Sequence, residues 1–242
     1  ENVKIINNSA NSRGGAIFFT YSATPVLSNV LITGNTGSNG NIVILFSSHP
    51  IFNQVTIANN VGSNTSVGSL DIQENCEITI SNSILYNNAP YEIGVYNGLA
   101  NISNSLIDGG FEGEGNIDAN PLFIDATNGD YRLSDYSPAI GAGTSDGAPT
   151  TDIDGNARPN PDGSSPDMGA YENALPSQLP KSGTIADGLG TDIDWSNSSS
   201  SLSANWASFT DNDAVNYEYA VGSSSGSSEE NYSLSFDGEN DD

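Results

Sequence analysis

Five short segments of the chain share one pattern of apolar and polar positions. They are residues 2–8, 29–35, 54–60, 82–88 and 104–110, and their third positions are separated by 27, 25, 28 and 22 residues. Apolar residues alternate with others within each segment, which is the period of a β-strand that buries one face. A repeat of this length predicts a solenoid whose strands stay in register while its turns vary in length.

The aligned segments place similar side chains in columns. The apolar columns are Val3, Val30 and Val55 with Ser83 and Ser105 as smaller members, and Ile5, Ile32, Ile57, Leu85 and Ile107. The polar columns are Asn2, Asn29, Gln54, Asn82 and Asn104, and Asn8, Asn35, Asn60 and Asn88. Stacked asparagines can hydrogen-bond to one another, and asparagine tolerates the left-handed bend of a turn. We therefore expect asparagine ladders in which one side chain both makes the corner and ties it to the next.

Two further strand-like runs separate these segments in each repeat. One set is 16–19, 41–45, 67–72 and 92–96, and the other is 25–27, 50–52, 77–80 and 99–102. Three short strands per turn predict an all-β parallel β-helix over residues 1–115. A β-sandwich of many short strands is the alternative, but its corners do not normally repeat in columns.

A series of short motifs follows the repeats, at 120–125, 129–133, 137–143, 152–156, 158–159 and 167–172. In this order they resemble the C-terminal end of bacterial right-handed parallel β-helix repeat proteins, which are large secreted or cell-surface proteins. The resemblance implies a right-handed solenoid, an extracellular location and an end near Glu172. A solenoid must also cover its last apolar turn. We therefore expect residues 116–173 to form an irregular cap across that turn.

The texture changes after the motif series. Residues 174–183 contain prolines and predict a linker. Residues 184–222 resemble the first strands of a fibronectin type III-like module. Residues 223–242 predict a flexible acidic tail, in which residues 232–239 resemble the first strand of a laminin G-like domain. The chain therefore has the pattern of a slice of a larger mosaic protein. Since it opens within a repeat, we expect the first turn to expose an edge that another chain or upstream residues cover.

The composition of the chain limits which classes of partner it can bind. The chain has 30 acidic and 5 basic residues, a formal net charge of -25, which argues against nucleic acid because phosphate binding requires clustered Lys and Arg. No apolar run approaches the ~18 residues of a membrane span. The single cysteine, Cys76, excludes an internal disulfide and is expected to be a small buried hydrophobe.

Catalytic candidates are sparse along the repeats. Between residues 2 and 107 the acids are Asp71, Glu74, Glu77 and Glu92. Of these, Asp71 and Glu92 could lie on adjacent turns as a carboxylate pair, although solvated faces are the favoured interpretation. His49 precedes a proline and is expected in a surface turn. The aromatic residues could stack on sugars, but stacking inside the solenoid is favoured: Phe18, Phe19, Tyr21, Phe46, Tyr86, Tyr91 and Tyr96.

One segment offers ligands for a metal. Asp152, Asp154 and Asn156 alternate as oxygen ligands do in calcium loops, although the later Glu of an EF-hand is missing. Plain turns are the competing explanation, because Asp and Asn also make turns without a metal. The sequence thus requires no cofactor and leaves Ca²⁺ as a candidate.

These features favour a non-enzymatic structural or adhesive segment of an extracellular or bacterial cell-surface protein. Its open turns could stack end to end with other copies. A carbohydrate-active enzyme, either a polysaccharide lyase or a glycoside hydrolase, and a glycan-binding module are the alternatives.

Overall fold

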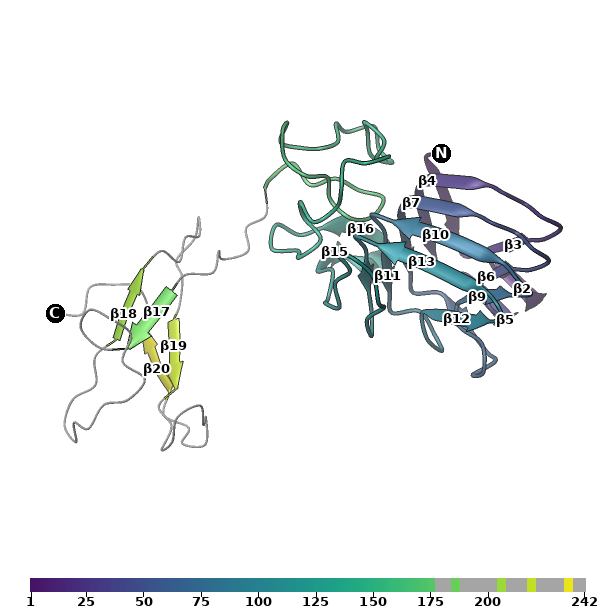
Figure 1. Ribbon diagram of the computed structural model, residues 1–242, viewed down its shortest axis with the longest axis horizontal. Helices are drawn as coiled ribbons and strands as arrows, with labels where there is room; N and C mark the ends of the chain where they lie inside the picture. The colour runs from purple at the N-terminus through teal and green to yellow at the C-terminus, as the bar shows by residue number, and fades with distance from the viewer. Residues whose placement is uncertain (177–183, 188–203, 208–216, 221–232, 237–242) are drawn as a thin grey trace. The chain divides into compact units, whose positions relative to one another are not determined.

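A computed structural model describes residues 1–176 and four strands further along the chain, and the two parts are treated separately. Residues 1–117 form a parallel β-solenoid (Figure 1). Its turns stack so that each strand pairs in parallel with its counterpart one turn away. The predicted parallel β-helix is therefore confirmed, and an antiparallel sandwich is excluded for this part. No helix among the described residues is long and apolar enough to cross a membrane.

Three sheets form the walls of the solenoid. The first contains β1 (Val3–Ile6), β4 (Val26–Thr33), β7 (Ile51–Ala58), β10 (Glu77–Ser81) and β13 (Leu99–Ser103), together with β11 (Ile84–Tyr86) and β14 (Leu106–Ile107). The second contains β3 (Ile17–Phe19), β6 (Ile42–Ile44), β9 (Leu70–Gln73) and β12 (Ile93–Tyr96). The third contains β2 (Ser9–Arg13), β5 (Thr36–Asn39) and β8 (Val61–Gly62).

One predicted wall of the solenoid is placed differently. Residues 26–27 and 29–33, expected on separate walls, both belong to β4, and β7 is built in the same way. Asn29 (φ 52°) and Gln54 (φ 58°) bend these strands through the left-handed region, while the ladder continues on either side. The third wall is instead β2, β5 and β8, whose short polar strands lack the alternation that reveals a strand in sequence.

The interior follows the predicted apolar columns. Val3 pairs with Val30 and Val30 with Val55, and the isoleucine column continues to Leu85 and Ile107. The second sheet supplies the facing side of the core through Ile42, Ile44, Leu70 and Ile72. Alternate residues point inwards, since successive side chains of a strand face opposite sides. The outward partners, such as Leu31 and Val43, lie outside this cluster.

Residues 118–173, which we call the lateral cover, pack along the outside of the first sheet. They contain β15 (Phe123–Asp125), the 3₁₀ helix η1 (Ala126–Asn128) and β16 (Asp130–Leu133), which lie beside the stacked strands (Figure 1). The cover buries Leu31, Ala58, Ile84 and Leu106, the outward side chains of four successive turns. The expected cap across the end turn is therefore wrong in its placement, because these apolar side chains must be covered along the length of the solenoid.

The end of the solenoid is closed by residues that precede the cover. Phe111 packs against the main core, and Ile117 bridges to Leu106 as a last strand-like contact. The first turn is less enclosed. Its inward Ile5 is only partly buried, whereas Ile32, one turn later, is fully buried.

The second part contains two antiparallel pairs. The strand β17 (Thr184–Asp187) pairs with β18 (Ala204–Ala207), and β19 (Tyr217–Ala220) pairs with β20 (Ser233–Phe236). The second pair joins strands from either side of the predicted boundary at 222/223. Residues 177–183 of the predicted linker and most of the predicted tail lie outside the described residues. The fibronectin-like and laminin-like resemblances stay predictions.

Candidate functional site

The suggested carboxylate pair, Asp71 and Glu92, lies on neighbouring turns but has separate partners. Gln73 Nε2 donates a 2.7 Å hydrogen bond to Asp71 Oδ2, while Glu92 accepts its hydrogen bonds from Asn88. Both carboxylates are buried, with 0 % and 7 % of their surface exposed. The expectation that they are solvated is therefore wrong. The turn at Gly40 packs against Asp71, and Glu92 lies at an enclosed corner of the solenoid.

Glu92 ends a ladder of stacked asparagines. Asn8, Asn35 and Asn60 each donate from the backbone N–H and from Nδ2 to Oδ1 of the next ladder residue, at 2.8–3.0 Å. The last residue, Asn88, donates its backbone N–H to Glu92 Oε1 at 2.8 Å and its Nδ2 to Oε2 at 2.6 Å. An ionised carboxylate only accepts hydrogen bonds, so it can end a chain that runs in this direction.

The ladder residues and the corner residues are neighbours rather than the same residues. The left-handed positions beside this ladder are Asn7, Gly34, Asn59 and Asn87. In the other polar column the left-handed residues are the column members themselves: Asn2, Asn29, Gln54, Asn82 and Asn104. Here the predicted tie between corners is seen from Asn29, whose Nδ2 donates to Asn2 Oδ1 at 3.1 Å. Gln54 differs, since its buried Oε1 and Nε2 have no hydrogen-bond partner among the described residues.

The carboxylate of Glu92 resists ionisation. Burial raises its pKa to about 7, the nearby charge of Asp108 adds to the rise, and the hydrogen bonds from Asn88 oppose it. A buried group of this kind can change the stability of the fold with pH. Both of its oxygens are engaged by the ladder, which argues against a role as a general acid or base.

The proposed calcium ligands lie in one turn of the lateral cover. Asp152 Oδ1 accepts the backbone N–H groups of Asp154 and Asn156 at 2.9 and 2.8 Å, and Oδ2 accepts from Asn156 Nδ2 and the backbone of Glu172. Asp154 instead lies 3.4 Å from Lys4 Nζ. Among the described residues no three His, Cys, Asp or Glu side chains gather as metal ligands. The turn is thus held together by Asp152 through four hydrogen bonds from the protein.

A buried ion pair in the lateral cover was not predicted from the sequence. Arg158 Nε lies 2.7 Å from Glu172 Oε2, with both side chains fully buried. Arg158 also donates to Asn29 Oδ1 at 2.7 Å and to the carbonyl of Gly169 at 3.0 Å. The pair therefore joins the cover to the corner of the second turn. The sequence feature that could have indicated this pair is that both residues lie in the motif series, Arg158 at 158–159 and Glu172 at 167–172.

Asp167 completes this buried network. Burial, followed by the adjacent charge of Glu172, raises the pKa of Asp167 to about 7. Its oxygens accept the backbone N–H groups of Gly141 and Asn173 at 2.8 and 2.6 Å. Asp167 and Glu172 are neighbouring carboxylates, but both are enclosed and bonded to backbone N–H groups, which argues against an acid–base pair. Their geometry holds loops in place.

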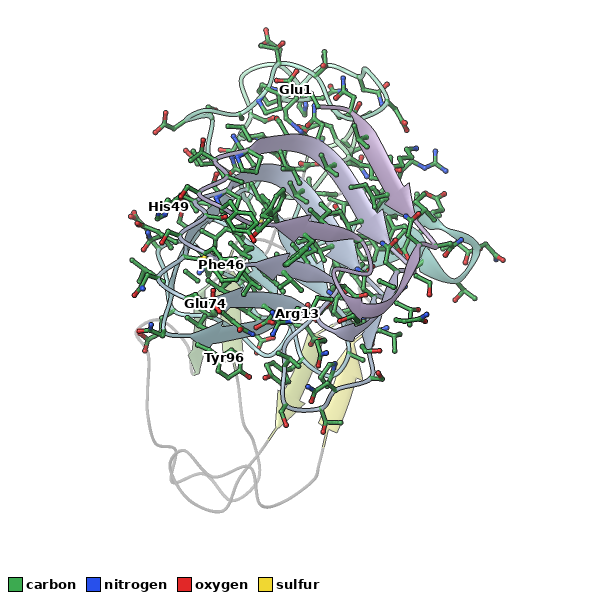
Figure 2. The ribbon with its side chains drawn as sticks, turned by 90° about the vertical axis from the view of Figure 1, so that its right-hand side faces the viewer. Glu1, Arg13, Phe46, His49, Glu74 and Tyr96 are labelled. Carbon is green, nitrogen blue, oxygen red and sulfur yellow. The ribbon has the colours of Figure 1, made fainter. Side chains whose placement is uncertain are left out.

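The cysteine and the histidine lie where they were expected. Cys76 is 1 % exposed in the main core, and its Sγ accepts the backbone N–H of Ser48 at 3.3 Å. Burial raises the pKa of its thiol, which disfavours the nucleophilic thiolate. His49 is exposed at a corner of the solenoid (Figure 2).

Most of the seven aromatic residues considered for sugar stacking have their side chains on the outside of the solenoid. Phe18, Tyr21, Phe46, Tyr91 and Tyr96 are all exposed. Of the other two candidates, Phe19 packs against the main core and Tyr86 packs against the cluster beneath the lateral cover. The rings of Tyr21 and Phe46 stack with centroids 5.3 Å apart. The expectation of stacking inside the solenoid is therefore wrong for these residues. Figure 2 views the solenoid from the side that carries Phe46, Arg13 and Tyr96.

Comparisons with known proteins add no identification. No family model matches the chain, no curated protein matches it, and no solved structure matches it. The class of protein is accordingly set by the fold alone, as a parallel β-solenoid with a lateral cover.

Proposed function

We propose that this chain is a non-catalytic structural segment of an extracellular or bacterial cell-surface protein, serving as a stiff spacer or adhesive stalk. The observation that carries this proposal is that the buried charged side chains named below are bonded to other groups of the protein. Arg158, Glu172, Asp167 and Asp152 bind one another, the backbone or a corner of the solenoid. Glu92 ends the asparagine ladder.

The lateral cover supports a mechanical role. A solenoid turn contacts only its neighbours, so turns can open from either end. The cover contacts turns one to five, from Lys4 in β1 to Leu106 in β14. It thereby links turns that do not touch one another. The extracellular location rests on the resemblance of the motif series.

A depolymerisation assay tests the proposal directly. The full chain would be incubated with neutral and uronate-containing polysaccharides, with and without calcium, and reducing ends and unsaturated products would be measured. We expect no product above a heat-treated control. Product that persists across preparations, and that Asp71→Asn or Glu92→Gln abolishes, would replace this proposal with a lyase or hydrolase.

A further inference from the structure

The corner that follows the second sheet carries a row of four exposed side chains, one from each turn. The members are Tyr21, Phe46, Glu74 and Asn97, which we call the corner row. The backbone N–H after each of the first three members donates to the carbonyl of the next member, at 2.9, 3.3 and 2.6 Å. Because neighbouring strands lie about 4.8 Å apart, the row extends roughly 14 Å along the solenoid. All four side chains are open to solvent, so a partner molecule can reach each of them.

The two aromatic members occupy positions that strain the backbone. Tyr21 (φ 56°) and Phe46 (φ 54°) both lie in the left-handed region, which bulky residues rarely adopt. Other corners of the solenoid place asparagine at such positions, as at Asn7 and Asn59. The two rings stack with centroids 5.3 Å apart and planes 14° apart, yet Tyr21 is 80 % and Phe46 is 44 % exposed. Burial in the core therefore does not offset the strain, and strained residues and exposed apolar patches both concentrate at binding surfaces.

The charge around the row favours a cationic partner. Glu74 lies one turn from Phe46 on the same side of the solenoid (Figure 2), and Glu77 is exposed three residues further on. Three of the basic residues in the described part of the chain are already paired with carboxylates of the lateral cover. The net charge of -25 attracts cations to the molecule as a whole. A guanidinium can pack flat on an aromatic ring and donate to a carboxylate at the same time, and the corner row offers both groups within one turn spacing.

We propose that the corner row binds an arginine side chain on an exposed segment of a partner protein. The guanidinium packs against the ring of Phe46 and donates to the carboxylate of Glu74, while Tyr21 extends the apolar surface for the rest of the segment. A neutral glycan also packs on aromatic rings, but only a cation gains from the carboxylates and from the net charge. This inference names the partner of the proposed adhesive role and rests on that role, because adhesion requires binding without cleavage.

Calorimetry on the full chain would compare a short peptide of alternating glycine and arginine with the same peptide carrying citrulline, the neutral analogue of arginine. We expect the arginine peptide to bind, the citrulline peptide not to bind, and added salt to weaken the binding by screening exposed charges. Phe46→Ala and Glu74→Gln should each weaken it about two- to fivefold, the size of an exposed cation–π or charged contact. The controls are Ile124→Ala and Asp162→Asn, which change an exposed apolar residue and an exposed acid of the lateral cover and should leave the affinity unaltered.

The controls separate a specific site from attraction by the net charge. Equal weakening by Asp162→Asn and Glu74→Gln would overturn the assignment, as would equal binding of the arginine and citrulline peptides or no binding of the arginine peptide at millimolar concentration. Binding of cellohexaose that Phe46→Ala abolishes, without binding of the arginine peptide, would assign the row to a glycan instead. None of these outcomes bears on the absence of catalysis, which the depolymerisation assay decides separately.

Discussion

The guanidinium of Arg158 and the carboxylate of Glu172 form a fully buried ion pair, with Nε and Oε2 2.7 Å apart. The same guanidinium donates to Asn29 at a corner of the solenoid. One arginine thus holds the lateral cover together and attaches it to the second turn. Removing one partner of a buried pair leaves an uncompensated charge, which is more costly than losing an exposed pair.

Arg158→Met tests this attachment. We expect the free energy of unfolding to fall by about 3–5 kcal/mol, because Glu172 is left buried without its cation. The measurement is urea unfolding followed by circular dichroism. Arg132→Met is the matched control, since Arg132 forms an exposed pair with Asp130, and its free energy of unfolding should fall far less than that of Arg158→Met. Equal losses in the two variants would contradict the attachment.

The asparagine ladder predicts a second large effect. Asn60→Ala leaves the N–H and Nδ2 of Asn35 without their acceptor and removes the donor to Asn88. Since each buried group left unpaired costs about 1–3 kcal/mol, the unfolding free energy should fall by roughly 3 kcal/mol. Asn101→Ala is the control, because it removes an exposed side chain that donates to Glu77. A similar loss for both variants would show that burial of the ladder adds nothing.

Glu92 gives the fold a dependence on pH. Its folded pKa of about 7 lies above the ordinary value of 4.5, so the folded state holds an extra proton between these values. Stability from this group is therefore full below pH 4.5 and is lost as the pH rises to about 7. Between pH 5 and pH 8 the loss is roughly 2 kcal/mol.

The measurement for Glu92 is a series of melting curves from pH 5 to pH 8 on the natural chain and on Glu92→Gln. The variant cannot ionise, so its melting temperature should decline less over this range. Asp167 contributes a decline of the same sign in both proteins. Identical slopes for the two proteins would rule out Glu92 as a source of the dependence.

Calcium should have little effect on the lateral cover. Both oxygens of Asp152 already accept hydrogen bonds from the protein, and a metal would have to displace these donors. We expect millimolar calcium to leave the melting temperature unchanged, while Asp152→Ala lowers it by removing the centre of the turn. A calcium-dependent rise that Asp152→Ala abolishes would restore the metal-site hypothesis.

The sequence was most informative where a position repeats. The columns from Val3 to Val55 and from Ile5 to Ile107 follow from alternation and spacing, because each turn buries the same face against its neighbours. The third wall was not predicted, since β2, β5 and β8 are polar and small. Nothing in their composition separates such strands from turns.

Local sequence patterns did not predict the lateral cover or the half-paired, buried carboxylate of Asp71. Leu31 reads as an ordinary outward residue of a strand, and only the folded contact with Tyr131 and Tyr171 shows that it needs a cover. Arg158 belongs to no repeating pattern in the sequence. Its burial depends on a contact with Asn29, 129 residues away, which local patterns cannot predict. Asp71 was singled out as an acid, but its missing partner is visible only in three dimensions.

Hydrogen exchange measured by mass spectrometry tests the central claim, that the lateral cover and the solenoid form one mechanical unit. Peptides from 29–35 and from 152–172 would be followed in the natural chain and in Arg158→Met. We predict that both peptides open with the same free energy in the natural chain, and that both lose protection together in the variant. Rapid exchange of 152–172 beside a protected 29–35 in the natural chain would contradict the claim.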